Sequence, residues 1–160
     1  MSDDRARRAL LRHTLATLAY RGAKAFRDPP AGFDTFRAAP ESRSAGEILA
    51  HIGDLLDWGL ALAQGRHQWK DSPTLPWAEG VARFHTALER FDAALAAPDG
   101  LGFSAEQLFQ GPIADSFTHV GQISLLRRLA SSPVKGENYL KADITTGRVS
   151  QVQPAPKVEF

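Results

Sequence analysis

Apolar and polar positions along the chain alternate with helical spacing in four long segments. The first segment runs from Asp3 to about Phe26, and Ser2 or Asp3 is a suitable N-cap. Its predicted buried face consists of leucines at helical spacing: Leu10, Leu11, Leu15 and Leu18. The pattern predicts that this helix lies against a core through one side only.

The second segment has a strong start signal. Ser44 is followed three residues later by Glu47, the spacing of a capping box, and Gly65 and Arg66 end the pattern. The apolar positions between these ends are Ile48, Leu49, Ile52, Leu55, Leu56, Leu60 and Leu62. His51 falls within this apolar stripe, so we expect its imidazole to point into the protein.

The third helix is predicted from Trp77 to about Ala96. Its buried side is marked by large apolar residues: Trp77, Val81, Phe84, Leu88, Phe91 and Leu95. Residues 104–110 follow as a short turn, in which Leu108 and Phe109 are expected to pack inward.

The fourth helix is predicted from Pro112, a residue suited to the first helical position, to Ala130. This helix is apolar nearly all round and is therefore expected to be central. It nevertheless carries Asp115 and His119, which are four residues apart and share one stripe with Gln122. A carboxylate and an imidazole in such a helix either hydrogen-bond to each other or bind a metal ion.

Two irregular segments complete the chain. Residues 27–43 contain three prolines and a glycine without a helical period, so they predict a long ordered loop that Phe33 and Phe36 pin to the bundle. From about residue 131 an irregular tail follows. Its candidate anchors, along the bundle or across a subunit boundary, are Tyr139, Val152 and Phe160. The predicted fold is an all-α four-helix bundle with a long loop between the first two helices.

Length and composition narrow the possible functions. The 160 residues predict a single domain, residues 1–160, and the net charge of +1 gives no overall field for attracting nucleic acid or acidic membranes. No apolar run is long enough to span a bilayer and no signal-peptide core is present, so a cytoplasmic location is expected. The first helix carries a basic cluster that is either a solvated face or a phosphate site: Arg5, Arg7, Arg8 and Arg12.

Three inward polar side chains predict a metal site. His51 lies on the second helix, and Asp115 and His119 lie on the fourth, so a site with two nitrogen ligands and one oxygen ligand is possible in the bundle. The chain contains no cysteine, which excludes disulfides, thiolate ligands and a protein-borne thiol nucleophile. Three protein ligands leave coordination positions open for water or substrate.

Other polar residues are candidates for supporting roles. Asp54, near the second-helix imidazole, could orient it or form a rim charge, and Gln122 could hydrogen-bond a ligand or the substrate. His85, at the edge of the third helix, is either a half-exposed boundary residue or a fourth ligand or substrate contact. His13 and His67 are expected at the surface.

The segments Ser44-Ala-Gly-Glu-Ile-Leu-Ala-His51-Ile-Gly-Asp and Asp115-Ser-Phe-Thr-His119-Val-Gly-Gln122 resemble the DinB/YfiT-like superfamily of four-helix bundles. That superfamily has a metal-binding histidine on its second helix and a His-x-x-x-His pair on its last, followed closely by Gly-Gln. The resemblance implies that His51 and His119 are ligands, with Asp115 where a histidine is usual. This carboxylate either favours harder ions such as Fe(II), Mn(II) or Zn(II) or marks a decayed site.

The resemblance also implies an activity. Such proteins use a divalent metal, here Zn, Ni, Fe or Mn, for transfer of a low-molecular-weight thiol such as bacillithiol or mycothiol, for maleylpyruvate-type isomerisation, or for hydrolysis. A small-molecule substrate and a homodimer are expected, with neither nucleic acid nor membrane as partner. One alternative is a non-enzymatic bundle, a binding or stress-related protein whose His/Asp trio is a buried hydrogen-bond network. Another is a nucleic-acid-binding module that uses the arginine cluster.

Overall fold

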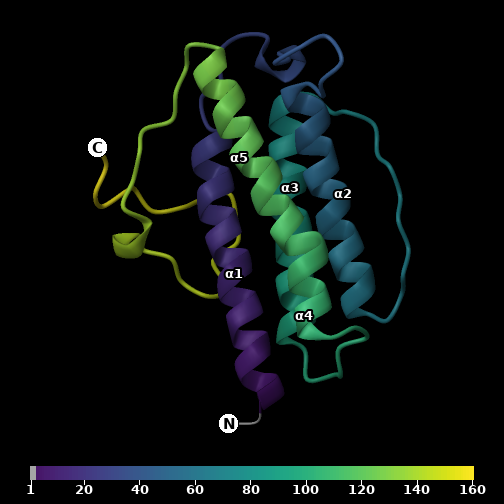
Figure 1. Ribbon diagram of the computed structural model, residues 1–160. Coiled ribbons are helices and arrows are strands. Elements are labelled where there is room, and N and C mark those ends of the chain that lie inside the picture. The colour runs from purple at the N-terminus through teal and green to yellow at the C-terminus, as the bar shows by residue number, and fades with distance from the viewer. Residues whose placement is uncertain (1–2) are drawn as a thin grey trace.

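The computed structural model describes residues 3–160, and its architecture is a bundle of long helices (Figure 1). The long helices are α1 (Asp3–Phe26), α2 (Ala45–Ala63), α3 (Trp77–Ala96) and α5 (Ala114–Leu129). Both α1 and α2 pack against α3 and α5, so the four surround a common core. The described residues contain no β-strand, only one isolated bridge between Glu137 and Glu159. The prediction of an all-α bundle is confirmed.

The start of α2 follows the predicted capping box. The Oγ of Ser44 accepts a hydrogen bond from the Glu47 amide at 3.2 Å, and the Glu47 carboxylate accepts one from the Ser44 amide at 2.7 Å. These two bonds satisfy amides that the first turn of a helix leaves without partners. The loop that precedes α2 therefore enters the helix in a fixed orientation.

The core is apolar and runs the length of the bundle. Its largest fully buried side chains come from α1, α2, α3 and the short segments that connect the long helices: Leu15, Leu18, Phe26, Phe33, Ile52, Leu56, Phe84, Leu88, Phe91, Leu95, Leu108 and Ile113. Close contact between α2 and α3 depends on Gly59, because a Cβ atom there would lie 2.5 Å from the Phe91 ring. No helix within residues 3–160 has the length and apolarity that crossing a membrane would require.

The most enclosed helix is α2, and the prediction of a central α5 is wrong. Every residue from Ile52 to Leu56 is buried, whereas Leu125 and Leu129 of α5 are more than half exposed. The apolar composition of α5 predicted too much burial, because some of its leucines lie on the outer face of the bundle. The polar residues of α5 consequently have access to solvent.

Two other apolar residues are also exposed, contrary to prediction. Leu10 of α1 is 66% exposed and Phe109 is 49% exposed, although Leu108 is buried as expected. Leu10 precedes the buried Leu11 by one residue, about 100° around the helix, and so points to the other side. Leu10 and Phe109 line one surface hollow of about 520 Å³.

A short helix, α4 (Ala105–Leu108), continues into α5 through the π-helical segment η2 (Phe109–Ile113). The amide of Ala114 donates to the carbonyl of Phe109, five residues earlier, which is the π-helical pattern. Pro112 has no amide hydrogen and cannot continue the α-helical ladder. Its predicted place at the first helical position is therefore wrong, because it lies inside a continuous helical stretch.

The loop between α1 and α2 is ordered as predicted. Its 3-10 turn η1 (Phe33–Thr35) buries Phe33, and Phe36 stacks beside that ring at 6.3 Å. The buried guanidinium of Arg127 donates to carbonyls at the end of α1, including Ala25 at 3.1 Å and Arg27 at 2.8 Å. The loop is thus fixed at both ends.

The tail from residue 131 runs beside α1, on the side away from α2, and includes the 3-10 turn η3 (Tyr139–Lys141) (Figure 1). Phe160 and Val152 are more than 80% exposed. The prediction that they anchor the tail along the bundle is therefore wrong. Tyr139 does contact α1, edge-on to Tyr20 at 6.3 Å. The buried tail residues are Glu137 and Val149.

The predicted N-cap of α1 is wrong for one of its two candidates. Asp3 lies inside α1 as its first described residue and is not the cap. The other candidate, Ser2, lies outside the described residues.

Candidate metal site

Side chains from α2 and α5 converge as the sequence predicted. Ligand atoms of His51, Asp115 and His119 all lie within 4.8 Å of one another. The Asp115 carboxylate is central, with one oxygen 3.4 Å from His119 Nε2 and the other 3.9 Å from His51 Nε2. The group could hold a metal ion.

The three side chains are arranged around a partly open space. The rings of His51 and His119 are perpendicular, with centroids 4.7 Å apart. Their side chains are 19% and 11% exposed, whereas the Asp115 side chain is 47% exposed. The group is therefore enclosed on the histidine side and open to solvent beside the carboxylate, which would let a small molecule approach.

Gln122 fixes the second histidine. Its side-chain oxygen lies 2.7 Å from His119 Nδ1, one turn along α5. An amide oxygen can only accept, so Nδ1 carries a proton and Nε2, facing Asp115, is the nitrogen that a metal ion would use. Metal-binding histidines are commonly oriented in this way by a hydrogen bond at the other ring nitrogen. The predicted supporting role of Gln122 agrees with this geometry.

The electrostatic surroundings keep His51 neutral. Burial lowers the pKa of His51, and the nearby charge of Arg43 lowers it further. Asp115 and Asp54 act in the opposite direction but do not reverse the shift. A neutral imidazole is the form that binds a metal.

The donor atoms are slightly farther apart than ligands of a bound divalent ion. Ligands about 2.0–2.2 Å from a tetrahedral zinc are about 3.3–3.6 Å from one another. The 3.4 Å contact of Asp115 with His119 is in this range, whereas the 3.9 Å contact with His51 is longer. The three ligand atoms lie up to 4.8 Å apart, so the side chains would have to move closer together around an ion. Two imidazoles and one carboxylate suit Zn(II), Fe(II), Ni(II) or Mn(II).

An aromatic residue that the sequence reasoning missed adjoins the trio. The ring of Trp69 lies 5.6 Å from that of His51, and its indole Nε1 donates to Asp71 at 3.0 Å. Trp58 of α2 packs edge-on against it at 5.9 Å. Trp69 lies in a loop without a helical period, so no periodic signal could have assigned it to the site.

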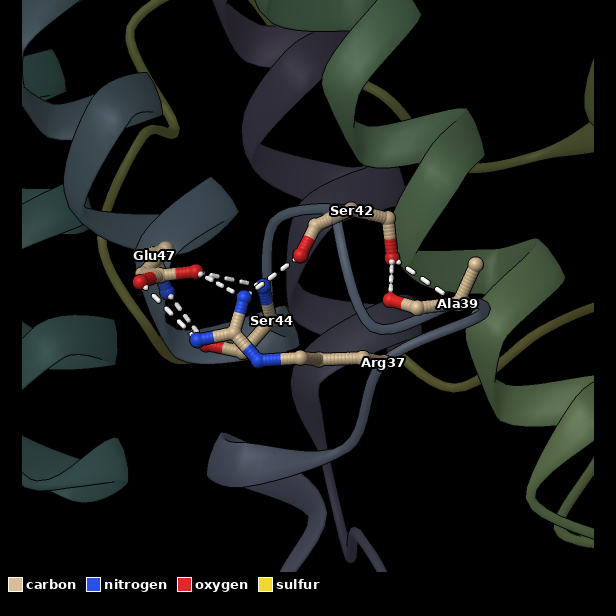
Figure 2. A network of polar contacts seen from close by, with 5 residues as sticks. All are labelled: Arg37, Ala39, Ser42, Ser44 and Glu47. Carbon is tan, nitrogen blue, oxygen red and sulfur yellow. Dashed lines mark hydrogen bonds and ion pairs between the residues drawn. The ribbon is translucent and has the colours of Figure 1, made fainter.

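A polar pocket of about 380 Å³ has His51 in its wall. Its rim is held by Arg37, which bonds both carboxylate oxygens of Glu47, at 2.8 and 3.1 Å, and the carbonyl of Ser42 (Figure 2). This network fixes the backbone on either side of Arg43. Arg43 also lines the pocket, and residues 3–160 place no carboxylate within 4 Å of its guanidinium.

No protein-family model, curated protein or solved structure matches this chain. The similarity of its two motifs to the DinB/YfiT-like superfamily therefore stays a prediction. What the chain can do has to be argued from the residues and geometry described above.

Two predicted supporting residues do not belong to the trio. The Asp54 carboxylate accepts hydrogen bonds from Arg83 at 2.7 Å and from the Ser72 amide at 3.1 Å. It therefore links α2 to α3 and to the loop between these two helices, and does not orient His51. His85 is 3% exposed and not half in solvent. Its Nδ1 lies 2.9 Å from the Val149 carbonyl, a contact with the tail that the sequence pattern could not show.

The remaining charged and imidazole side chains lie apart from the trio. His13 and His67 are exposed, as expected. Three of the four arginines in the basic cluster of α1 pair with carboxylates: Arg7 with Asp3 and Glu106, Arg8 with Asp4, and Arg12 with Asp92. Arg5 forms no ion pair with the residues that the structure describes. These ion pairs favour a structural role for the basic cluster over phosphate binding.

Proposed function

We propose that this chain is a metal-dependent enzyme of the DinB/YfiT-like superfamily, with an open divalent-metal site held by His51, Asp115 and His119. The observation that carries the proposal is the convergence of their ligand atoms, from two helices, to within 4.8 Å. The motif similarity and the hydrogen bond from His119 to Gln122 support it independently.

The proposed chemistry is transfer of a low-molecular-weight thiol, such as bacillithiol or mycothiol, or hydrolysis. A divalent ion held by these residues would leave a coordination position open, and it would lower the pKa of a bound thiol or water so that the nucleophile could form near neutral pH. The chain has no cysteine, so a thiol would have to arrive as a cosubstrate. This reaction suits the cytoplasm, where small thiols stay reduced.

Different residues of the chain would bind the metal, orient a ligand and shield the site. His51 and His119 supply neutral nitrogen ligands and Asp115 an anionic oxygen, while Gln122 holds the His119 ring in its ligating tautomer. Trp69 shields His51 on the loop side. The adjoining polar pocket, with Arg43 on its rim, is the place for a small polar substrate.

The non-enzymatic alternative, a hydrogen-bonded His/Asp network, has less support. Within the described part of the chain, His51, Asp115 and His119 approach each other without forming a hydrogen bond among themselves, and Asp115 is nearly half exposed. A buried network would normally pair its members with good geometry.

Metal content tests the proposal. We expect anaerobically purified protein to contain about one transition-metal ion per chain by elemental analysis, and the double variant His51→Ala/His119→Ala to contain none. His67→Ala, which removes an exposed histidine, is the matched control and should keep the metal. A metal-free wild-type protein whose melting temperature does not respond to added Zn(II), Ni(II), Fe(II) or Mn(II) would exclude the proposed site.

We further propose that the chain forms a homodimer. The supporting observation is the exposed pair Leu10 and Phe109, which line an apolar hollow beside α1 and α4. Light scattering should give twice the mass of one chain, and Leu10→Asp should reduce it to a monomer. Leu140→Asp, at an exposed leucine of the tail, is the control that should leave the dimer intact.

A further inference from the structure

A second cavity, of about 600 Å³, lies between α1, α5 and the tail. The side chains that define it are Arg21, Phe117, Val120, Arg128, Lys135 and Tyr139. None of the three proposed metal ligands lines it. Its volume is in the range that holds a small organic ligand.

The lining of this cavity combines apolar side chains with charged ones. Its apolar part includes Phe117 and Val120 of α5 and Tyr139 of the tail. Gly121 of α5 also lines the cavity and is exposed, and a Cβ atom added there would meet no atom within 4 Å. The space above Gly121 is therefore unfilled by the protein, and a larger side chain at this position would enter the cavity.

The rim carries an excess of positive charge. Arg21 lies over the Tyr139 ring at 4.0 Å, and residues 3–160 place no carboxylate within 4 Å of the guanidinium of Arg21 or Arg128. Lys135 has one distant carboxylate partner, Glu159, at 3.9 Å. A cation held over an aromatic ring keeps its charge available to an anion.

The carboxylate that lines the cavity, Glu137, is already neutralised. Its side chain is fully buried, one oxygen accepts from the Tyr20 hydroxyl at 2.6 Å, and the other accepts from Lys24 at 2.7 Å. Burial, and then the bond to Glu137, raises the pKa of Tyr20, so the hydroxyl stays a donor. Glu137 therefore does not offset the charge of the rim.

The tail wall is held in place by a short paired segment. The Asn138 amide donates to the Val158 carbonyl at 3.0 Å, and the Phe160 amide donates to the Gly136 carbonyl at 3.1 Å. Lys24 also bonds Glu159 at 3.0 Å, which ties both halves of this segment to α1. The cavity is thus a built feature with fixed walls on each side.

We propose that this cavity binds a small amphipathic anion, with an apolar body between Phe117, Val120 and Tyr139 and a carboxylate or phosphate head group at Arg21 and Arg128. Arginine forks suit both kinds of head group. The site is separate from the proposed metal site, and binding there does not depend on a metal ion.

Octanoate and octyl phosphate are suitable probes, with octanamide and acetate as controls that lack the charge or the chain. Isothermal titration of the full chain should show binding of one octanoate or octyl phosphate per chain, at least tenfold tighter than either control. The affinity should be unchanged by a chelator and in His51→Ala/His119→Ala. Octanamide binding as tightly as octanoate would overturn the proposal.

Substitutions locate the site. Gly121→Leu should abolish probe binding while leaving the helix intact, because leucine is a better helix former than glycine. Arg21→Gln/Arg128→Gln should weaken octanoate at least tenfold but not octanamide, whereas Arg66→Gln/Arg90→Gln, at exposed arginines of other elements, should have no effect. Retained probe binding in Gly121→Leu would contradict the proposal. Dissociation of a dimer by Gly121→Leu would also contradict it, because a second copy of the chain would then be the occupant of the cavity.

Discussion

His119 Nδ1 lies 2.7 Å from the side-chain oxygen of Gln122, and this contact determines which nitrogen of the ring faces Asp115. Without an acceptor at Gln122, the proton could move to Nε2 and remove the lone pair that a metal needs. Gln122 therefore acts on the site although it is not one of the three proposed ligands.

Gln122→Leu should weaken metal binding by about 10- to 100-fold, the usual effect of losing a hydrogen-bond partner of a histidine ligand. Gln122→Glu keeps an acceptor at the same position and should bind at least as tightly as wild type. Competition with a chromophoric chelator measures both affinities. Equal affinities for wild type and Gln122→Leu would show that the hydrogen bond does not orient the ligand.

Asp115→His should retain a metal site and change its preference. A third imidazole in place of a carboxylate favours Zn(II) and Ni(II) over Mn(II), because Mn(II) prefers oxygen ligands. The metal content after incubation with equimolar Mn(II) and Zn(II) reports this change. Asp115→Leu, which removes the donor, should bind neither ion firmly, and undiminished loading of that variant would mean that the carboxylate is not a ligand.

Acid should destabilise the fold through His85. Burial lowers the pKa of His85 below its usual value of 6.5, against the opposing effects of the Val149 hydrogen bond and Glu89. The unfolded chain thus takes up a proton at a higher pH than the folded one. The free energy of unfolding is therefore retained above about pH 6.5 and falls as the pH drops toward the folded pKa, by at most about 1.4 kcal/mol per pH unit for one group.

Urea titrations between pH 5 and pH 7.5, with a chelator present, measure this dependence. His85→Asn keeps a donor for the Val149 carbonyl but does not titrate, so its stability should vary less with pH than that of wild type. His51, whose pKa is also lowered, contributes in the same direction in both proteins. Identical slopes for wild type and His85→Asn would exclude His85 as the source.

Lys24→Met should destabilise the protein by about 3–5 kcal/mol, because it leaves the fully buried Glu137 carboxylate without its cation. Lys24→Met/Glu137→Gln buries no charge and should recover part of that loss. A double-mutant cycle by urea denaturation gives the coupling between the two residues. A loss below about 1 kcal/mol for Lys24→Met would show that the tail contributes little to the stability of the bundle.

The periodicity of the sequence predicted those features of the fold and of the site that depend on the spacing of nearby residues. The capping box at Ser44, the extent of α3 and the shared stripe of Asp115 and His119 all follow from residues within a few turns of one another. The convergence of that pair with His51 follows from the inward stripe of α2. These features needed no knowledge of how the tail or the long loops pack.

Features that depend on distant contacts were missed. His85 is buried because Val149, from the tail, covers it. Asp54 forms an ion pair with Arg83, which belongs to another helix. Trp69 reaches the site from an aperiodic loop. Apolar periodicity marks which residues can be buried but does not say which partners exist to cover them, as exposed Leu10 shows.

The π-helical segment Phe109–Ile113 sets the rotational phase of everything that follows it in α5. An α-helix advances about 100° per residue, so removing one residue from this segment turns Asp115 and His119 away from α2 while every side chain of the site is still present. Relatives with a shorter segment here would need their ligands at shifted positions. The number of residues between Leu108 and Asp115 therefore distinguishes a chain that can form this site from a chain that has the same residue types but places them on another face of the helix.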